Sequence, residues 1–199
     1  EDSNGLSIKT DIIHAREKYL TMGSKTENAT NANMLDQIVS THVWLENNLT
    51  NQYELLSTSV QTWHDNWIYR DYKGNESTFN VWRKHKSYAW KGSGIGLNPN
   101  GTIADTNGAT SFNWWNNQEP PSNSGWLKLS ETTRYNKYSG IVEQLDVNGL
   151  KMSMKYSLED TKTIAQANTD YENFYFADFE EYNIATDGLS GELNSLGSN

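Results

Sequence analysis

The sequence contains no cysteine among its 199 residues. This absence excludes disulfide bonds, a thiolate nucleophile and any metal site that uses sulfur ligands. It leaves the cellular compartment open, because many exported proteins also lack cysteine. Any stabilisation must therefore come from packing, hydrogen bonds and charge.

Basic residues are also scarce, with 16 Lys+Arg against 25 Asp+Glu and a net charge of -9. Such a chain repels phosphate backbones, so we expect no nucleic-acid partner. The sequence has no apolar run of about 18 residues, the minimum for a membrane helix, which predicts no membrane span in the given chain. No basic amphipathic stretch suggests binding to a membrane surface either.

Aromatic residues, by contrast, are plentiful: 8 Trp, 11 Tyr and 5 Phe. Each buries a large area, so a chain of this length can form an ordinary core. The abundance of Asn, Ser, Thr and Trp favours an extracytoplasmic location, which means the cell surface, a secreted state or the periplasm. The chain begins with Glu1, as we expect of a processed or truncated protein.

Apolar residues in the first third recur at steps of three and four, the spacing of one helix face. Residues 6–22 carry them at Ile8, Ile12, Ala15, Tyr19 and Met22, and residues 34–64 at Met34, Ile38, His42, Leu45, Leu49, Tyr53, Leu56, Val60 and Trp63. The spacing predicts a shorter helix, a polar linker and a long helix over 34–64. We expect residues 1–33 to form the helix and linker, and residues 34–199 to form a single domain.

After Asp65 the sequence changes to short aromatic segments that are typical of strands. Asn148-Gly149 separates the extended runs 141–145 and 150–156, which predicts a β-hairpin. Leu150, Met152, Met154 and Tyr156 alternate with polar residues, so this face is expected to pack inward. The predicted fold class is α+β, with the long N-terminal helix packed on an antiparallel sheet.

Few residue patterns suggest catalysis. The four histidines, His14, His42, His64 and His85, form no metal-ligand spacing, and His42 is interpreted as a packed residue. Glu180-Glu181 and Glu159-Asp160 are adjacent acids, which more often belong to a solvated surface than to a pair of catalytic carboxylates. The sequence therefore predicts a protein that is not an enzyme.

Two loops are candidates for binding. Asn98, Asn100 and Asp105 place oxygen atoms around Gly101, which suggests either a weak calcium site or a simple turn. No other cofactor is expected. The second loop interleaves aromatic rings with amides, a pairing suited to a glycan or a protein partner, although such rings also cover the edge of a core. Its candidate contact residues are Trp114, Trp115, Asn116 and Asn117, together with Trp126.

Several short segments between residues 52 and 195 resemble type IV pilins and the related minor pilins. They are Trp63, Tyr69, Lys73-Gly74-Asn75, Ser77-Thr78 and Trp82, then 98–103, 126–129 and 138–140, and finally the tail segments 182–184, 187–189 and 190–191. The resemblance implies a long helix on an antiparallel sheet and a subunit that assembles with other subunits. It does not extend to the apolar first half of a pilin helix, because residues 17–33 are polar.

From these features we expect a non-catalytic structural or tip subunit of a type IV pilus-like surface appendage, acting in filament assembly or adhesion. Two other hypotheses remain open at this stage. One is an extracytoplasmic ligand-sensing domain of a membrane receptor, which a helix leading into a sheet would suit. The other is a carbohydrate-binding adhesin module, suggested by the tryptophan loop.

Overall fold

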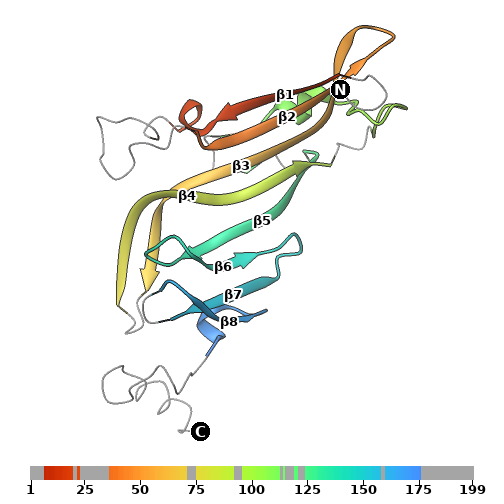
Figure 1. Ribbon diagram of the computed structural model, residues 1–199. Helices are drawn as coiled ribbons and strands as arrows, with labels where there is room; N and C mark the ends of the chain where they lie inside the picture. Colours follow the sequence, from red (N-terminus) through yellow and green to blue (C-terminus); the bar gives the residue numbers. More distant parts are fainter. Residues whose placement is uncertain are drawn as a thin grey trace, which may run out of the picture. The chain divides into compact units, whose positions relative to one another are not determined.

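The described residues form an antiparallel meander of eight strands (Figure 1). The computed structural model describes residues 7–19, 22, 36–70, 75–91, 96–112, 114, 119–120, 124–157 and 160–175. Each strand is hydrogen-bonded to the next along the chain; the strands are β1 (Ile8–His14), β2 (Ile38–Asn47), β3 (Gln52–Arg70), β4 (Glu76–Trp90), β5 (Trp126–Tyr135), β6 (Ile141–Leu145), β7 (Lys151–Tyr156) and β8 (Thr163–Ala167). Helical structure in these ranges is limited to α1 (Thr106–Thr110) and the 3-10 turns η1 (Ala15–Glu17) and η2 (Tyr171–Asn173).

The predicted α+β fold with a long N-terminal helix is wrong. The stretch predicted as the long helix forms β2, a turn and the first part of β3, and the shorter predicted helix contains β1 and η1. β2 is rich in β-branched residues, among them Ile38, Val39, Thr41 and Val43, which favour strands. Apolar residues on both faces of a strand can match helical spacing by coincidence, and that happened here.

The turn between β2 and β3 carries a signal against a helix. Backbone N–H groups of Thr50 and Asn51 both donate to the Asn47 carbonyl, and Asn51 has a positive φ of 52°. Asparagine accepts this left-handed conformation more readily than most residues. The polar cluster in the middle of the predicted helix is therefore a hairpin turn. The predicted boundary at residue 33 lies outside the described residues.

The chain divides into two compact units, each described here by itself. Unit 1 comprises Glu1–Asp65 and Asn80–Glu131, and unit 2 comprises Asn66–Phe79 and Thr132–Asn199. The strand character predicted for segments 67–72 and 79–90 is confirmed where the structure describes them: 67–70 is the end of β3, and 79–90 belongs to β4.

In unit 1, the register of β2 and β3 separates two faces of the sheet. The inner face carries Ser40 opposite Val60, His42 opposite Thr58 and Trp44 opposite Leu55. A covering segment, residues 96–112, packs on this face, with Ile103 and Ala109 against Leu55. The outer face carries the intervening positions of β1, β2 and β3: Ile8, Thr10, Ile12, Thr41, Val43, Leu45, Ser57 and Ser59.

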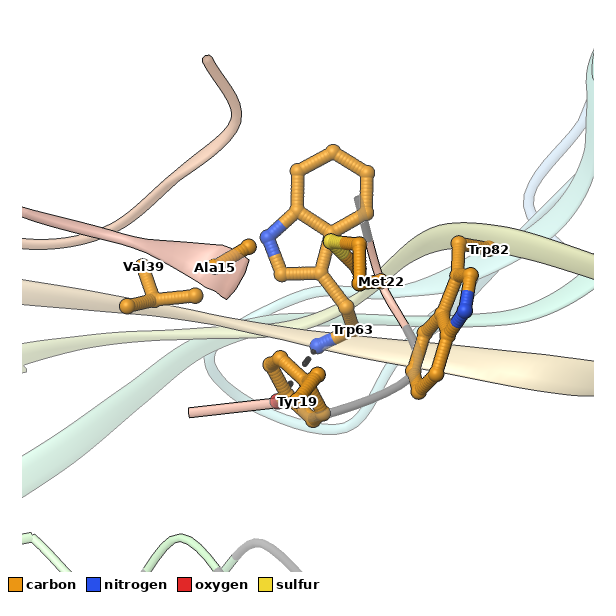
Figure 2. Packing of buried hydrophobic residues seen from close by; sticks show 6 residues of the cluster. All are labelled: Ala15, Tyr19, Met22, Val39, Trp63 and Trp82. Carbon is orange, nitrogen blue, oxygen red and sulfur yellow. Dashed lines mark hydrogen bonds between the residues drawn. The ribbon is translucent and has the colours of Figure 1, made fainter. Parts of the chain in front are cut away.

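A second cluster in unit 1 forms where the chain leaves β1 (Figure 2). Tyr19 and Met22 are buried with Trp63 and Trp82, and the Tyr19 and Trp82 rings lie 5.0 Å apart. The Tyr19 hydroxyl oxygen accepts the backbone N–H of Trp63 at 2.9 Å. Burial raises the Tyr19 pKa to about 12, and this hydrogen bond opposes the rise only in part. A side chain thereby satisfies a buried backbone donor of β3.

The hairpin predicted in unit 2 is confirmed. β6 and β7 pair with Leu145 opposite Lys151, and Gly149 in the connecting turn has a φ of 77°. The prediction that the face of β7 carrying Met152, Met154 and Tyr156 packs inward, together with Leu150, is not confirmed. Leu150 is exposed, whereas Ser153, on the other face, is fully buried and donates to the Thr169 carbonyl at 2.7 Å. The helix predicted to cover this face is not formed, because residues 38–64 make two strands and a turn.

Unit 2 is organised around the buried carboxylate of Glu143. Its Oε2 accepts the backbone N–H of Tyr171 at 2.9 Å, and its Oε1 accepts the Thr133 hydroxyl at 2.6 Å. The Lys151 ammonium lies 3.9 Å from the same carboxylate and also bonds Asp170. The Lys155 ammonium lies 3.8 Å from the Tyr171 ring centroid, a cation–π contact. These bonds hold η2 on the sheet.

The β5–β6 turn is built around Asn136, which is almost fully buried. Its Oδ1 accepts the backbone N–H groups of Tyr138 and Gly140 at 3.0 and 2.7 Å. A Cβ atom at Gly140 would lie 2.8 Å from Asn136 Nδ2 and 3.0 Å from the Tyr156 ring. Ser139, between them, has a positive φ of 71°.

We therefore expect Gly140→Ala to destabilise the protein by roughly 1–3 kcal/mol, because the methyl group displaces Asn136 or Tyr156. Ser139→Gly, the matched control, should be neutral or stabilising by about 0.5 kcal/mol, because glycine tolerates positive φ. Urea unfolding of both variants measures the difference. Equal losses of stability in the two variants would contradict the packing described for this turn.

Candidate functional site

The tryptophans proposed as ligand contacts take part in the core of unit 1. Trp126 is buried, and its indole N–H donates to the Ser111 carbonyl at 3.0 Å. Trp114 is partly buried, with its ring 4.8 Å from that of Phe112. It packs against two clusters of buried residues, the one around Trp63 shown in Figure 2 and one formed by Val60, Tyr88 and Trp126. Both therefore adopt the core role that the sequence left open. Trp115, Asn116 and Asn117 lie outside the described residues.

The residues of the candidate calcium loop have separate structural partners. Asp105 caps α1, because its Oδ1 accepts the Gly108 N–H at 2.9 Å. Asn98 donates through Nδ2 to the Thr102 hydroxyl at 2.9 Å. Asn100 donates to the carboxylate of Glu54 at 2.6 Å. In the described parts of the chain, no group of three His, Asp or Glu side chains has the geometry of a metal site.

Glu54 was missed by the sequence analysis, yet it is the hub of this loop. One oxygen accepts both Asn100 Nδ2 and the Thr102 hydroxyl, at 2.6 and 2.7 Å, and the other accepts Asn47 Nδ2 at 2.6 Å. The hydrogen bonds from Asn100, Asn47 and Thr102 hold the pKa of Glu54 below its ordinary value, against a smaller effect of burial. The carboxylate therefore ties the covering segment to the β2–β3 hairpin.

Because the folded-state pKa of Glu54 is depressed, its stabilising effect is present above the unfolded-state pKa and is lost as the pH falls through the folded-state value. We expect Glu54→Gln to lower the unfolding free energy at about pH 7 and to have a smaller effect once the pH is below the folded-state pKa of Glu54, where the wild-type carboxyl is protonated. Titrating from pH 7 into the acid range covers both conditions. Urea titrations of both proteins at each pH measure this. Glu46→Gln, on the facing strand, removes the same charge without touching these three donors, and should show a smaller effect that varies less with pH.

A charged cluster lies on β4 and β5 of unit 1. The Lys86 ammonium is buried and bonds Glu119, and it also lies 3.9 Å from Glu131. The Tyr88 hydroxyl donates to Glu119 at 2.8 Å, while Lys128 lies 2.6 Å from Glu131. Two carboxylates thus share one buried cation, which offsets the cost of burying it.

Two histidines border this cluster. His85 Nε2 lies 3.6 Å from Glu131, and the His85 and His64 rings are 5.4 Å apart. These groups include two imidazoles, two carboxylates and two ammonium groups, which are the kinds of group that proton transfer uses. Their interactions join β3, β4 and β5, which is a structural role.

Electrostatics within the cluster support that structural role. Burial raises the pKa of Glu119, but hydrogen bonds from Lys86 and Tyr88 outweigh it, and the net shift is downward. Burial, together with the Glu119 hydrogen bond and charge, raises the pKa of Tyr88 far above its ordinary value. Glu119 is thus held as an anion and Tyr88 as a neutral donor.

We expect Tyr88→Phe to cost about 1 kcal/mol of stability, because Glu119 loses a donor inside a partly buried site. Tyr53→Phe, at an exposed position of β3, serves as the control and should change the unfolding midpoint little. Thermal and urea unfolding measure both. If Tyr88→Phe is as stable as the control, the hydroxyl contributes nothing to holding Glu119 in place.

His42 is confirmed as a packed residue. It is 8% exposed, and both ring nitrogens have partners: Ser40 Oγ lies 3.0 Å from Nε2 and Thr58 Oγ1 lies 2.8 Å from Nδ1. Burial lowers the His42 pKa, and the Asp11 carboxylate opposes this shift. Although Ser40, His42 and Asp11 are neighbours, Ser40 is fully buried, so its hydroxyl is not presented to a substrate.

The outer face of the sheet in unit 1 exposes large aliphatic side chains on its edge strand. Ile8 and Ile12, on the edge strand β1, are 55% and 46% exposed. The register places Ile8 opposite Leu45 and Thr10 opposite Val43, so these side chains share one face of the sheet. The helical interpretation of residues 6–22 hid this surface. The alternation in Ile8-Lys9-Thr10-Asp11-Ile12 was the signal that could have revealed it.

Comparisons with protein-family models, with curated proteins and with solved structures find no match to this chain. The resemblance to pilins therefore stays a prediction, and the fold that it implied is not observed. Within the described ranges, no helix has both the length and the apolar character that crossing a membrane requires.

Proposed function

We propose that this chain is a non-catalytic structural module of an extracytoplasmic surface assembly, and that it acts by binding a partner through β1 and the outer face beside it. The observation that carries the proposal is the exposure of Ile8 and Ile12 on a strand at the edge of the sheet. Large exposed aliphatic residues on an edge strand promote association with another chain. A protein keeps such a surface where association is its function.

The charged groups of the described residues support a structural module. Glu54 bonds the covering segment, Glu119 and Glu131 share Lys86, and Glu143 holds the η2 turn. Each carboxylate is engaged by donors from neighbouring elements of the fold. Such satisfied pairs are a common means of joining strands and loops, and they require no substrate.

The composition favours an extracytoplasmic setting, and the resemblance to pilins suggests filament assembly or adhesion as the role there. A pilin joins its filament through a long helix, but residues 38–64 here form two strands and a turn. Contacts in the proposed assembly are therefore made by the sheet. Strand addition suits such a contact, because main-chain hydrogen bonds supply affinity and alternate side chains supply specificity.

A photo-crosslinking amino acid at Ile12 tests the proposal in cells that produce the full-length protein. We expect a discrete crosslinked product from position 12, at the cell surface. The matched control is Val147 of unit 2, which is similarly exposed at 48% and lies in a hairpin turn. Equal crosslinking from both positions, or none from position 12, would overturn the proposal.

A further inference from the structure

The outer edge of β1 is not paired with any strand in the described part of the chain. β1 pairs with β2 on one side and is the first strand in the order of the sheet, with no other described strand beside it (Figure 1). The Ser7 carbonyl accepts the Glu46 N–H at 2.9 Å, so position 7 faces β2. Backbone groups alternate sides along an antiparallel strand. Ile8, Thr10 and Ile12 therefore direct their N–H and C=O groups away from β2.

The side chains of this strand divide its two faces by chemistry. Lys9 and Asp11 lie on the inner side of the sheet, opposite Trp44 and His42, and form a 3.1 Å ion pair. Both remain solvent-accessible, with side-chain exposures of 53% and 43%. Ile8 and Ile12 lie on the outer face, on either side of Thr10. Thr10 is therefore flanked symmetrically by two isoleucines at a distance of two residues. Its immediate neighbours, Lys9 and Asp11, carry opposite charges.

We propose that β1 pairs antiparallel with β1 of a second copy of this chain, about a two-fold axis at Thr10. This inference rests on the proposed function and deepens it by naming the partner. Lys9 then faces Asp11 of the second copy, and Asp11 faces its Lys9. Ile8 and Ile12 face each other across the pair and extend the apolar strip of the outer face. Opposite charges and β-branched residues in such cross-strand positions are favourable.

The charges select this register over its neighbours. Residues whose backbone N–H and C=O groups point away from β2 must lie opposite the same kind of residue in the second copy. The nearest alternative registers therefore have their two-fold axis at Lys9 or at Asp11. A centre at Lys9 places the two lysines opposite each other, and a centre at Asp11 does the same for the two aspartates. Like charges directly opposite are destabilising. A two-fold interface of this kind is closed and self-complementary.

Cysteine variants test the register directly, because the chain has no cysteine of its own. In the proposed pair the two Thr10 Cα atoms lie about 5.5 Å apart, as in a hydrogen-bonded antiparallel pair, within the range of a disulfide. The two Ile12 positions are four residues out of register, about 13 Å apart along the strands. Under mild oxidation, we expect Thr10→Cys to form a covalent dimer and Ile12→Cys to remain largely monomeric.

Charge variants test the partner. Lys9→Glu and Asp11→Lys each place like charges opposite one another, so each alone should weaken self-association by about tenfold. Mixing the two variants restores opposite charges at every facing position, and the mixture should dimerise about as well as the wild type. Thr10→Pro removes only an outward N–H group and should leave the β1–β2 ladder intact while abolishing the dimer. Analytical ultracentrifugation over a concentration series measures the self-association of the wild type, of the three variants and of the mixture.

The inference is overturned if Thr10→Cys crosslinks no faster than Ile12→Cys, or if the mixed charge variants associate no better than either alone. Circular dichroism and urea unfolding check that each variant is folded. A crosslink from position 12 to a different protein, with Thr10→Cys monomeric, would reject the second copy as partner and leave the proposed function standing. A Thr10→Cys dimer in solution, without any crosslink from position 12 in cells, would support the self-pairing of β1 and reject the proposed function.

Discussion

The Glu54 carboxylate joins the two chain segments on which the core of unit 1 depends. It accepts hydrogen bonds from Asn47 in the hairpin and from Asn100 and Thr102 in the covering segment. Next to it, the Ile103 N–H donates to the Leu55 carbonyl at 2.6 Å. These bonds seat Ile103 and Ala109 on Leu55. A two-sided sheet must bury one face to be stable, and this carboxylate fixes the segment that buries it.

Covering one face of the sheet determines the character of the other. The covering segment packs on the inner face, whereas Ile8, Ile12, Val43 and Leu45 share the opposite face beside exposed serines. Because β1 is the first strand of the sheet, its exposed apolar side chains lie beside an edge that no described strand covers. The surface proposed for association thus follows from the same alternation of side chains that builds the core.

Local patterns of the sequence predicted some features well and others poorly. The Asn148-Gly149 hairpin was correct because its turn chemistry depends on residues adjacent in the chain. The packed state of His42 was also correct. The helix over 34–64 was wrong because steps of three and four also arise when both faces of a strand carry apolar residues. The β-branched content of β2 and the asparagines around residue 48 were the better evidence.

The sequence by itself determined the absence of thiol chemistry, the acidic charge, the aromatic supply for a core and the β6–β7 hairpin, since these depend on composition or on neighbouring residues. Only the tertiary structure decided that Trp126 belongs to the core, that Glu54 binds Asn100, and that Lys86 is shared by Glu119 and Glu131. Such pairs are separated by tens of residues, and no local spacing encodes them. The two faces of β1 became distinguishable in the same way, because the partner strand β2 sets which side of an edge strand faces the core and which faces solvent.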